Sequence, residues 1–264
     1  MNLIKKSFQF KEYALHLINA KSIHSIHSPF VFDFVKNVLY DYRNFYVYNE
    51  IERLRKELLA FSQKISIEPP EFHTPYTNNI TKSIAEIIKA SAKPPRQAQL
   101  LFRIANHYGC KKMLELGTSF GFTSCYLSGA GKESYVITLE GNKAVCAFAQ
   151  KNFTRLNRKN IELICGAFNE TLKGALQKLN LVDLIFFDGD HRKSLTIDYF
   201  VESLPYLHEN SILIFDDIHW SKGMNEAWEI IKSYERVTLT IDLYYFGIVF
   251  FRKALSKQHY IIKI

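Results

Sequence analysis

The sequence lacks several features that would indicate particular classes of protein. Its four cysteines form no Cys-x-x-Cys pair, which argues against a zinc site or a fold held by disulfides. No apolar stretch approaches the roughly 20 residues that a membrane-spanning helix needs. Lys11 and Glu12 interrupt the apolar residues near the N-terminus, so we expect no secretory signal peptide. We therefore expect a cytoplasmic protein with reduced thiols at Cys110, Cys125, Cys146 and Cys165.

The remaining composition is that of a folded chain with a basic surface. A chain of 264 residues with 47% hydrophobic side chains can bury a full core. The net charge of +8 comes from basic residues that are scattered along the sequence, which is typical of an ordinary solvated surface. Attraction to anionic substrates or RNA is an alternative that this charge leaves open.

Proline is scarce, and three of the seven prolines fall within residues 65–80. We interpret this segment as a linker, in which His73 and Tyr76 are either substrate contacts or surface turn residues. Before it, apolar residues recur at helical spacing, so residues 1–80 are predicted to form a helical region that acts as a lid or a homodimer contact. Residues 81–264 are predicted to form the second domain, which begins with helices at 81–91 and 95–108.

From residue 112 onward, apolar strand-like runs alternate with helix-like segments. This βα repeat predicts a parallel sheet with right-handed crossovers. Two further strand-like runs, 236–241 and 244–252, are so close in sequence that only an antiparallel hairpin can join them. The predicted fold class is therefore α/β. Its expected strands are 112–116, 134–139, 160–165, 182–187 and 211–216, and its expected helices are 122–130, 142–156, 169–179, 192–207 and 222–234.

Glycine is also scarce, with 11 residues, but two glycines bracket the turn that follows the first of these strands. A strand, a glycine turn and a helix start in that order are typical of a nucleotide-binding loop, because glycine lets backbone N–H groups approach a ligand. A dinucleotide site requires Gly-x-Gly-x-x-Gly, whereas this chain has Glu115-x-Gly117-x-x-x-Gly121.

This pattern resembles motif I of the class I S-adenosylmethionine (SAM) methyltransferases, and the predicted Rossmann-like sheet with its antiparallel hairpin resembles their fold. The resemblance implies that the glycine loop passes under the methionine part of SAM and that Glu140, after the second strand, accepts the ribose hydroxyls. The family often has Gly-Asp after the third strand, whereas this chain has Gly166-Ala167. We therefore expect the adenine ring to be recognised by backbone atoms and by the shape of the site. The candidate cofactor-binding residues are Glu115, Gly117, Thr118, Ser119, Gly121, Thr123, Glu140, Gly141, Ala167, Phe168 and Asp188. An alternative for Thr123 is that it only caps its helix.

Four carboxylates and two imidazoles follow the fourth and fifth predicted strands, in Asp188-Gly189-Asp190-His191 and Asp216-Asp217-Ile218-His219. Parallel strands end at the same edge of a sheet, so these side chains should lie close together. Helix capping with solvent exposure accounts for one Asp in each loop, but it accounts poorly for two adjacent Asp residues. A divalent cation bound by carboxylate oxygens, most simply Mg²⁺, explains the cluster better.

The two loops resemble those of the metal-dependent O-methyltransferases of the catechol and caffeoyl-CoA type. The resemblance implies that Asp188, Asp216 and Asp217 bind the metal, although that family has Asp-Asn where this chain has Asp216-Asp217. It also places His191 where the family has a lysine general base. We therefore expect His191 and Asp188 to be catalytic, with His191 taking the proton of a small-molecule hydroxyl that attacks the SAM methyl group.

Two other functions are compatible with parts of the sequence. The basic charge is compatible with a nucleic-acid (RNA) methyltransferase, but the chain has no Asn-Pro-Pro-Tyr or Asp-Pro-Pro-Tyr motif and no Pro-Cys nucleophile. A SAM-binding protein without catalytic activity would not need the acidic cluster. The sequence therefore favours methyl transfer to a small molecule, and it does not identify the acceptor.

Overall fold

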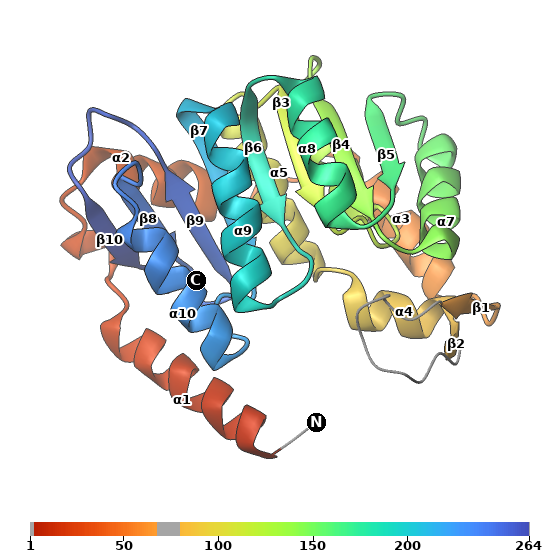
Figure 1. The fold of residues 1–264 in the computed structure, drawn as a ribbon, viewed down its shortest axis with the longest axis horizontal. Coiled ribbons are helices and arrows are strands. Elements are labelled where there is room, and N and C mark those ends of the chain that lie inside the picture. The colour runs from red at the N-terminus through yellow and green to blue at the C-terminus, as the bar shows by residue number, and fades with distance from the viewer. Residues whose placement is uncertain (1–2, 68–79, 264) are drawn as a thin grey trace. The chain divides into compact units, whose positions relative to one another are not determined.

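The computed structural model describes residues 3–67 and 80–263 (Figure 1). His73, Tyr76 and most of the expected linker lie outside these residues. The chain divides into two compact units, one formed by residues 41–175 and the other by residues 1–40 together with 176–264. Within the part of the chain that is described, no helix is both long enough and apolar enough to span a membrane.

The unit of residues 41–175 contains the first part of the βα repeat. Strands β3, β4 and β5 lie side by side in that order and run parallel. Their neighbours in sequence are helices, and helix α5 packs against α6 in this unit. The elements are α3 (Tyr46–Leu59), β1 (Lys64–Ile67), β2 (Ile80–Ser83), α4 (Ile84–Ser91), α5 (Pro95–His107), β3 (Lys112–Leu116), α6 (Phe122–Ser128), β4 (Tyr135–Glu140), α7 (Lys143–Arg155), β5 (Ile161–Cys165) and the start of α8 (Phe168–Leu179).

The predicted start of the helix at residue 81 is wrong, because the helix begins at Ile84. Residues 80–83 instead form strand β2, which pairs antiparallel with β1. Ser83 ends the strand and caps α4, because its hydroxyl accepts the backbone N–H of Glu86 while the Glu86 carboxylate accepts the backbone N–H of Ser83. This capping box gives the helix a fixed start at Ile84.

The second unit contains the remaining strands in the order β10-β8-β9-β7-β6. Strand β9 is antiparallel to both β7 and β8, as the predicted hairpin requires. The elements are α1 (Leu3–Asn19), a 3₁₀ turn (Ile23–Ser25), α2 (Pro29–Phe34), a π-helical turn (Val35–Leu39), β6 (Val182–Phe187), α9 (Lys193–Ser203), a 3₁₀ turn (Leu204–Tyr206), β7 (Leu207–Asp216), α10 (Lys222–Ser233), β8 (Leu239–Asp242), β9 (Phe246–Phe250) and β10 (Gln258–Ile261).

The predicted α/β fold, with parallel strands and an antiparallel hairpin, is confirmed. Strand β10 was not predicted; it pairs parallel with β8. Strand β7 begins at Leu207 rather than near residue 211, which shortens the helix expected to end there. The apolar residues of β3, β6, β8 and β9 are buried, whereas those of β5 are only partly buried. The polar residues that can take part in chemistry therefore lie at the ends of the strands.

Candidate functional site

The glycine loop joins β3 to α6 through a backbone that favours glycine. Gly117 and Gly121 have φ angles of 101° and 79°, and Ser119 between them has a φ of 48°. A Cβ atom at Gly121 would lie only 2.3 Å from a ring carbon of Phe153. Gly121 is therefore required both by its conformation and by the space available. Gly121 is also the N-cap of α6, so Thr123 lies inside the helix and does not cap it.

Two of the predicted cofactor-binding residues lie beneath the loop. Glu115 is completely buried and accepts hydrogen bonds from the hydroxyls of Thr138, at 2.6 Å, and Ser124. The Thr118 hydroxyl, also buried, lies 2.6 Å from that of Thr138. Burial raises the pKa of Glu115 to about 7, although the hydrogen bonds from Ser124 and Thr138 oppose that rise. Glu115 and Thr118 thus support the loop from within, and their contact with SAM stays a prediction.

Glu140, the last residue of β4, holds the loop from the other side. Its Oε2 atom accepts the backbone N–H of Ser119 at 2.9 Å, and its Oε1 atom accepts that of Asn142 at 2.9 Å. Burial raises the pKa of Glu140, and these two backbone hydrogen bonds act in the opposite direction. Each oxygen still has a lone pair for one further donor, so the carboxylate can accept the two hydroxyls of a ribose.

The third strand ends beside Glu140. Cys165 at the end of β5 pairs with Glu140 across the sheet, and the backbone N–H of Gly166 donates to the Glu140 carbonyl at 2.9 Å. Ala167 and Phe168 follow and are partly exposed. The Ala167 methyl group offers no hydrogen bond, so an adenine ring there would meet backbone atoms and apolar surface. Gly141 is exposed, and a Cβ atom there would meet no other atom within 4 Å.

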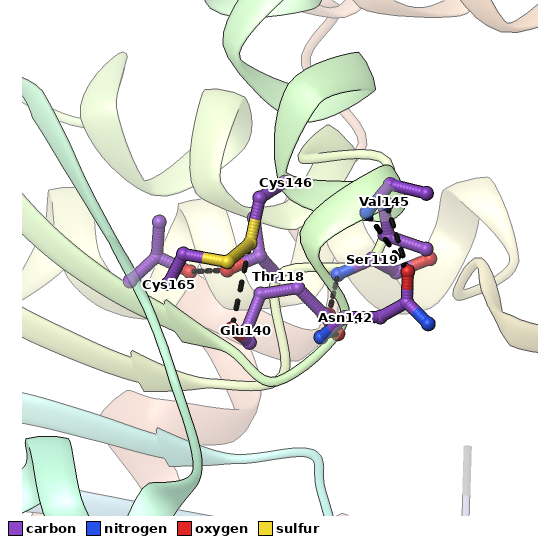
Figure 2. The surroundings of a disulfide bond; sticks show 9 residues. Thr118, Ser119, Glu140, Asn142, Val145, Cys146 and Cys165 are labelled. Carbon is purple, nitrogen blue, oxygen red and sulfur yellow. Dashed lines mark hydrogen bonds between the residues drawn. A yellow bond between two sulfur atoms is a disulfide. The ribbon is translucent and has the colours of Figure 1, made fainter. Parts of the chain in front are cut away.

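The prediction that all four thiols are reduced is wrong for one pair. Cys146 on α7 and Cys165 form a disulfide beside Glu140 and Asn142, as Figure 2 shows. No spacing in the sequence indicates this bond, because the two residues meet only after β5 has paired with β4. Cys110 and Cys125 are buried and not disulfide-bonded.

Sequence reasoning also missed a residue that contacts the glycine loop. The hydroxyl of Ser91, the last residue of α4, lies 2.7 Å from the hydroxyl of Ser119. This contact connects the loop to a helix that precedes it by 28 positions, and no motif in the sequence indicates it.

The acidic cluster lies in the other unit, at the ends of β6 and β7. Phe187 and Phe215 are register partners in these parallel strands, and their rings stack at 4.4 Å. The next residue of each chain segment is an aspartate, so Asp188 and Asp216 emerge together at the strand ends. Asp188, His191 and Asp216 offer ligand atoms that all lie within 4.8 Å of one another. The structure therefore brings together three of the residues that the sequence singled out.

Asp217 and Asp190 have different surroundings. The Asp217 carboxylate lies 3.9 Å from His191 Nε2, and its residue adopts a left-handed φ of 53° while its N–H donates to the Tyr245 carbonyl. Asp217 is therefore next to the group of three but is not one of its members. Asp190 pairs with Arg192 and is not needed as a metal ligand.

The donor atoms of this cluster suit a divalent cation. Asp188 and Asp216 provide hard carboxylate oxygens, and Asp217 would complete the all-oxygen set that Mg²⁺ prefers. His191 would instead complete a mixed nitrogen and oxygen set that suits Mn²⁺ or Zn²⁺. The residues present thus fit a metal, and the choice of third ligand decides whether the His191 imidazole remains available as a base.

Sequence comparison agrees with this geometry. Residues 114–218 match the profile of a family described as "Methyltransferase domain". A catechol O-methyltransferase of Niastella koreensis is 28% identical over 142 residues, which cover 52% of this chain and 63% of that protein. A catechol O-methyltransferase of Mycobacterium tuberculosis is 26% identical over 125 residues, which cover 47% of this chain and 55% of that protein. The chain thus matches less than two thirds of the length of these relatives.

Comparison with solved structures shows the fold. An O-methyltransferase of Bacillus cereus in complex with SAH superposes with a TM-score of 0.56 and 19% identity, covering 83% of this chain and 96% of that one. The matched profile includes the glycine loop, Glu140 and the acidic residues up to Ile218. The resemblance to class I SAM methyltransferases is therefore confirmed over residues 114–218, and the Rossmann-like fold is confirmed.

Proposed function

We propose that this protein is a SAM-dependent O-methyltransferase that acts on a hydroxyl of a small molecule with the help of a divalent cation. The observation that carries the proposal is the convergence of Asp188, His191 and Asp216 at adjacent strand ends of a methyltransferase domain. Carboxylates and an imidazole in one group can hold a cation and accept a proton. The match to catechol O-methyltransferases supports a small-molecule acceptor.

The glycine loop and Glu140 are the proposed SAM-binding residues. Glu140 is already held by the backbone N–H groups of Ser119 and Asn142, so ribose binding requires no movement of its carboxylate. Ser119, Gly141, Ala167 and Phe168 are the other proposed contacts, while Gly117 and Gly121 shape the loop. Preorganisation of this kind lowers the entropy that binding costs.

The acidic cluster is the proposed site of chemistry. Asp188 and Asp216, with Asp217 as the third ligand, would hold a divalent cation, whose positive charge would lower the pKa of an acceptor hydroxyl. In that arrangement His191 keeps its imidazole free and takes the hydroxyl proton, as the sequence predicted. The deprotonated oxygen then attacks the methyl group of SAM, and the sulfur leaves as a neutral thioether.

Calorimetry of SAM binding, with and without Mg²⁺, tests the cofactor part of this proposal. We expect micromolar binding to the wild-type protein and a loss of about 10–100-fold in Glu140→Gln, because a hydrogen bond to a charged group contributes about 1.5–3 kcal/mol. The matched control is Glu133→Gln, which changes an exposed carboxylate whose partner is Lys111. Equal affinities for all three proteins would contradict the assignment of Glu140.

We also propose that the protein is cytoplasmic and forms a homodimer, as the sequence predicts. The Cys146–Cys165 disulfide is an observation against a reducing compartment, where thiols usually stay reduced. Trapping of free thiols in intact cells tests the location, since a cytoplasmic protein should be fully labelled at both residues. Light scattering of the purified protein tests the oligomeric state.

A further inference from the structure

A second group of potential ligands lies in the same unit as the acidic cluster, but it uses different residues. It consists of His16 on α1, His219 in the loop after β7, and Asp242 at the end of β8; we call it the His16 cluster. Their ligand atoms all lie within 4.8 Å of one another. His219 Nε2 is 2.8 Å from Asp242 Oδ2, and His16 Nδ1 is 3.2 Å from Asp242 Oδ1. Three segments far apart in sequence thus direct two imidazoles and a carboxylate at one point.

The cluster is buried, and one of its atoms lacks a proper partner. His16 and Asp242 are only 5% and 7% exposed. Although His16 Nδ1 lies only 3.2 Å from Asp242 Oδ1, it makes no well-aligned hydrogen bond to any described residue. Burial of a polar atom in this state is unfavourable. His16 Nδ1 is therefore directed into the cluster, where a cation would replace its poorly aligned contact with Asp242.

Neighbouring residues orient the cluster as a metal site requires. The Nδ1 atom of His219 lies 2.8 Å from Asn225 Oδ1, and the Asn225 amide nitrogen donates to Glu12 at 2.9 Å. Because Glu12 fixes the direction of the amide, Asn225 Oδ1 must accept a hydrogen bond from the N–H at His219 Nδ1. His219 Nε2, which lies 2.8 Å from Asp242 Oδ2, is then the nitrogen at which a cation would replace a proton. Outer partners of this kind set the tautomer of histidine ligands in metal sites.

The carboxylate of Asp242 is held in a similar way. Its Oδ1 atom accepts the backbone N–H of Tyr244 at 2.8 Å, and the Tyr244 ring stacks on that of His219. The carboxylate and the His219 imidazole therefore have fixed orientations before any ion arrives. Metal sites differ from chance clusters in that the ligand side chains are held in place by hydrogen bonds to neighbouring residues.

We propose that the His16 cluster is a binding site for a divalent transition-metal ion, most simply Zn²⁺. His16 Nδ1, His219 Nε2 and one Asp242 oxygen would provide three ligands, and water would complete a four-coordinate site. Two imidazoles favour Zn²⁺ over Mg²⁺ or Ca²⁺, which prefer oxygen. The ion would join α1 to the loop that carries Asp217, so its expected role is structural.

Cobalt substitution in the full-length protein tests this proposal. After chelator treatment, Co²⁺ added to wild-type protein should give the visible absorption of a low-coordinate nitrogen and oxygen site. The signal should persist in Asp188→Asn/Asp216→Asn, which removes the other cluster. It should be lost when His16→Ala or His16→Gln is added to that double variant, with the affinity for Co²⁺ lowered at least about 100-fold, since removal of even an outer partner typically costs 10–100-fold.

The matched control is His208→Ala. His208 also pairs with an aspartate, Asp183 at 3.0 Å, but that pair has no third ligand among the described residues. With Asp188→Asn/Asp216→Asn present throughout, Zn²⁺ should raise the Tm of the protein with His16 intact and of His208→Ala, and leave that of both His16 variants unchanged. Circular dichroism checks that the variants are folded. Absence of Co²⁺ binding to wild type, or equal binding to the His16 variants, would overturn the proposal and leave a hydrogen-bonded network.

Discussion

At the scale of single residues, Gly121 is the position where the loop depends most on glycine. Its φ of 79° and the 2.3 Å approach of Phe153 leave no room for a side chain. We expect Gly121→Ala to lower the free energy of unfolding by about 2–4 kcal/mol, from strain in the left-handed backbone and overpacking against the ring. Denaturant unfolding measures this change.

The control for this prediction is Gly174→Ala. Gly174 lies in α8, and a Cβ atom there meets nothing within 4 Å. Alanine should therefore stabilise the helix by about 0.5–1 kcal/mol. If both variants changed stability by the same amount and in the same direction, the loop geometry described above would be wrong.

Glu115 gives the chain a predictable dependence of stability on pH. Its pKa is raised to about 7 in the folded protein from a usual value of 4.5. Between these two pH values the unfolded chain has released the proton and the folded chain has not, so this residue's contribution falls as pH rises. The contribution is fully present below pH 4.5 and lost above pH 7.

Glu115→Gln should remove this dependence, because the amide oxygen can still accept hydrogen bonds from Ser124 and Thr138. We expect the variant to be as stable as wild type near pH 4.5 and more stable at pH 8 by up to about 3 kcal/mol. Thermal unfolding of both proteins across this range measures the difference. A constant difference at all pH values would show that Glu115 does not titrate in this window.

At the scale of helices and strands, the sequence was most informative where patterns are local. Met113–Leu116 is a short apolar run, and it is buried as a strand. Ser28 and Pro29 indicate a helix start, and the structure has Pro29 at the first position of α2 with the Ser28 hydroxyl accepting the Val31 N–H. Capping and apolar periodicity act over a few residues, so they can be recognised without the fold.

Features that depend on long-range pairing could not be predicted. Strand β10 has a weak pattern of its own and forms because Gln258–Ile261 finds β8 as a neighbour. The hairpin of β1 and β2 and the Cys146–Cys165 bond likewise require distant residues to meet. The same limit holds for the candidate sites. Their positions at the ends of predicted strands were enough to single out Glu140 and Asp188 as candidate site residues. Only the fold shows that Glu115 is buried beneath its loop.

The disulfide should stabilise the segment from Cys146 to Cys165, which lies between Glu140 and Gly166 in the sequence. Cys146 and Cys165 are 19 positions apart, and closing a loop of that size stabilises a protein by about 3 kcal/mol. We expect reduction with dithiothreitol to lower the free energy of unfolding by a comparable amount. In the control, Cys146→Ser/Cys165→Ser, the reductant should have no effect. A similar response of wild type and control would show that the bond does not form in solution.

At the scale of the whole molecule, each compact unit holds one part of the proposed chemistry. The unit of residues 41–175 holds the glycine loop and Glu140, which are the proposed SAM-binding residues. The unit of residues 1–40 and 176–264 holds the acidic cluster and the His16 cluster. Loss of the acidic cluster should therefore abolish methyl transfer while the affinity for SAM stays within a few-fold of wild type.

The most direct test of the central claim is the transfer of a radiolabelled methyl group from SAM to a catechol, measured with Mg²⁺ and then with EDTA. We expect labelled product from the wild-type protein with Mg²⁺, and a loss of at least about 100-fold with EDTA or in Asp216→Asn, because the acceptor hydroxyl would keep its proton. Labelling that is equally fast with EDTA, or no labelling of any vicinal diol by a protein that binds SAM, would contradict metal-assisted O-methyl transfer.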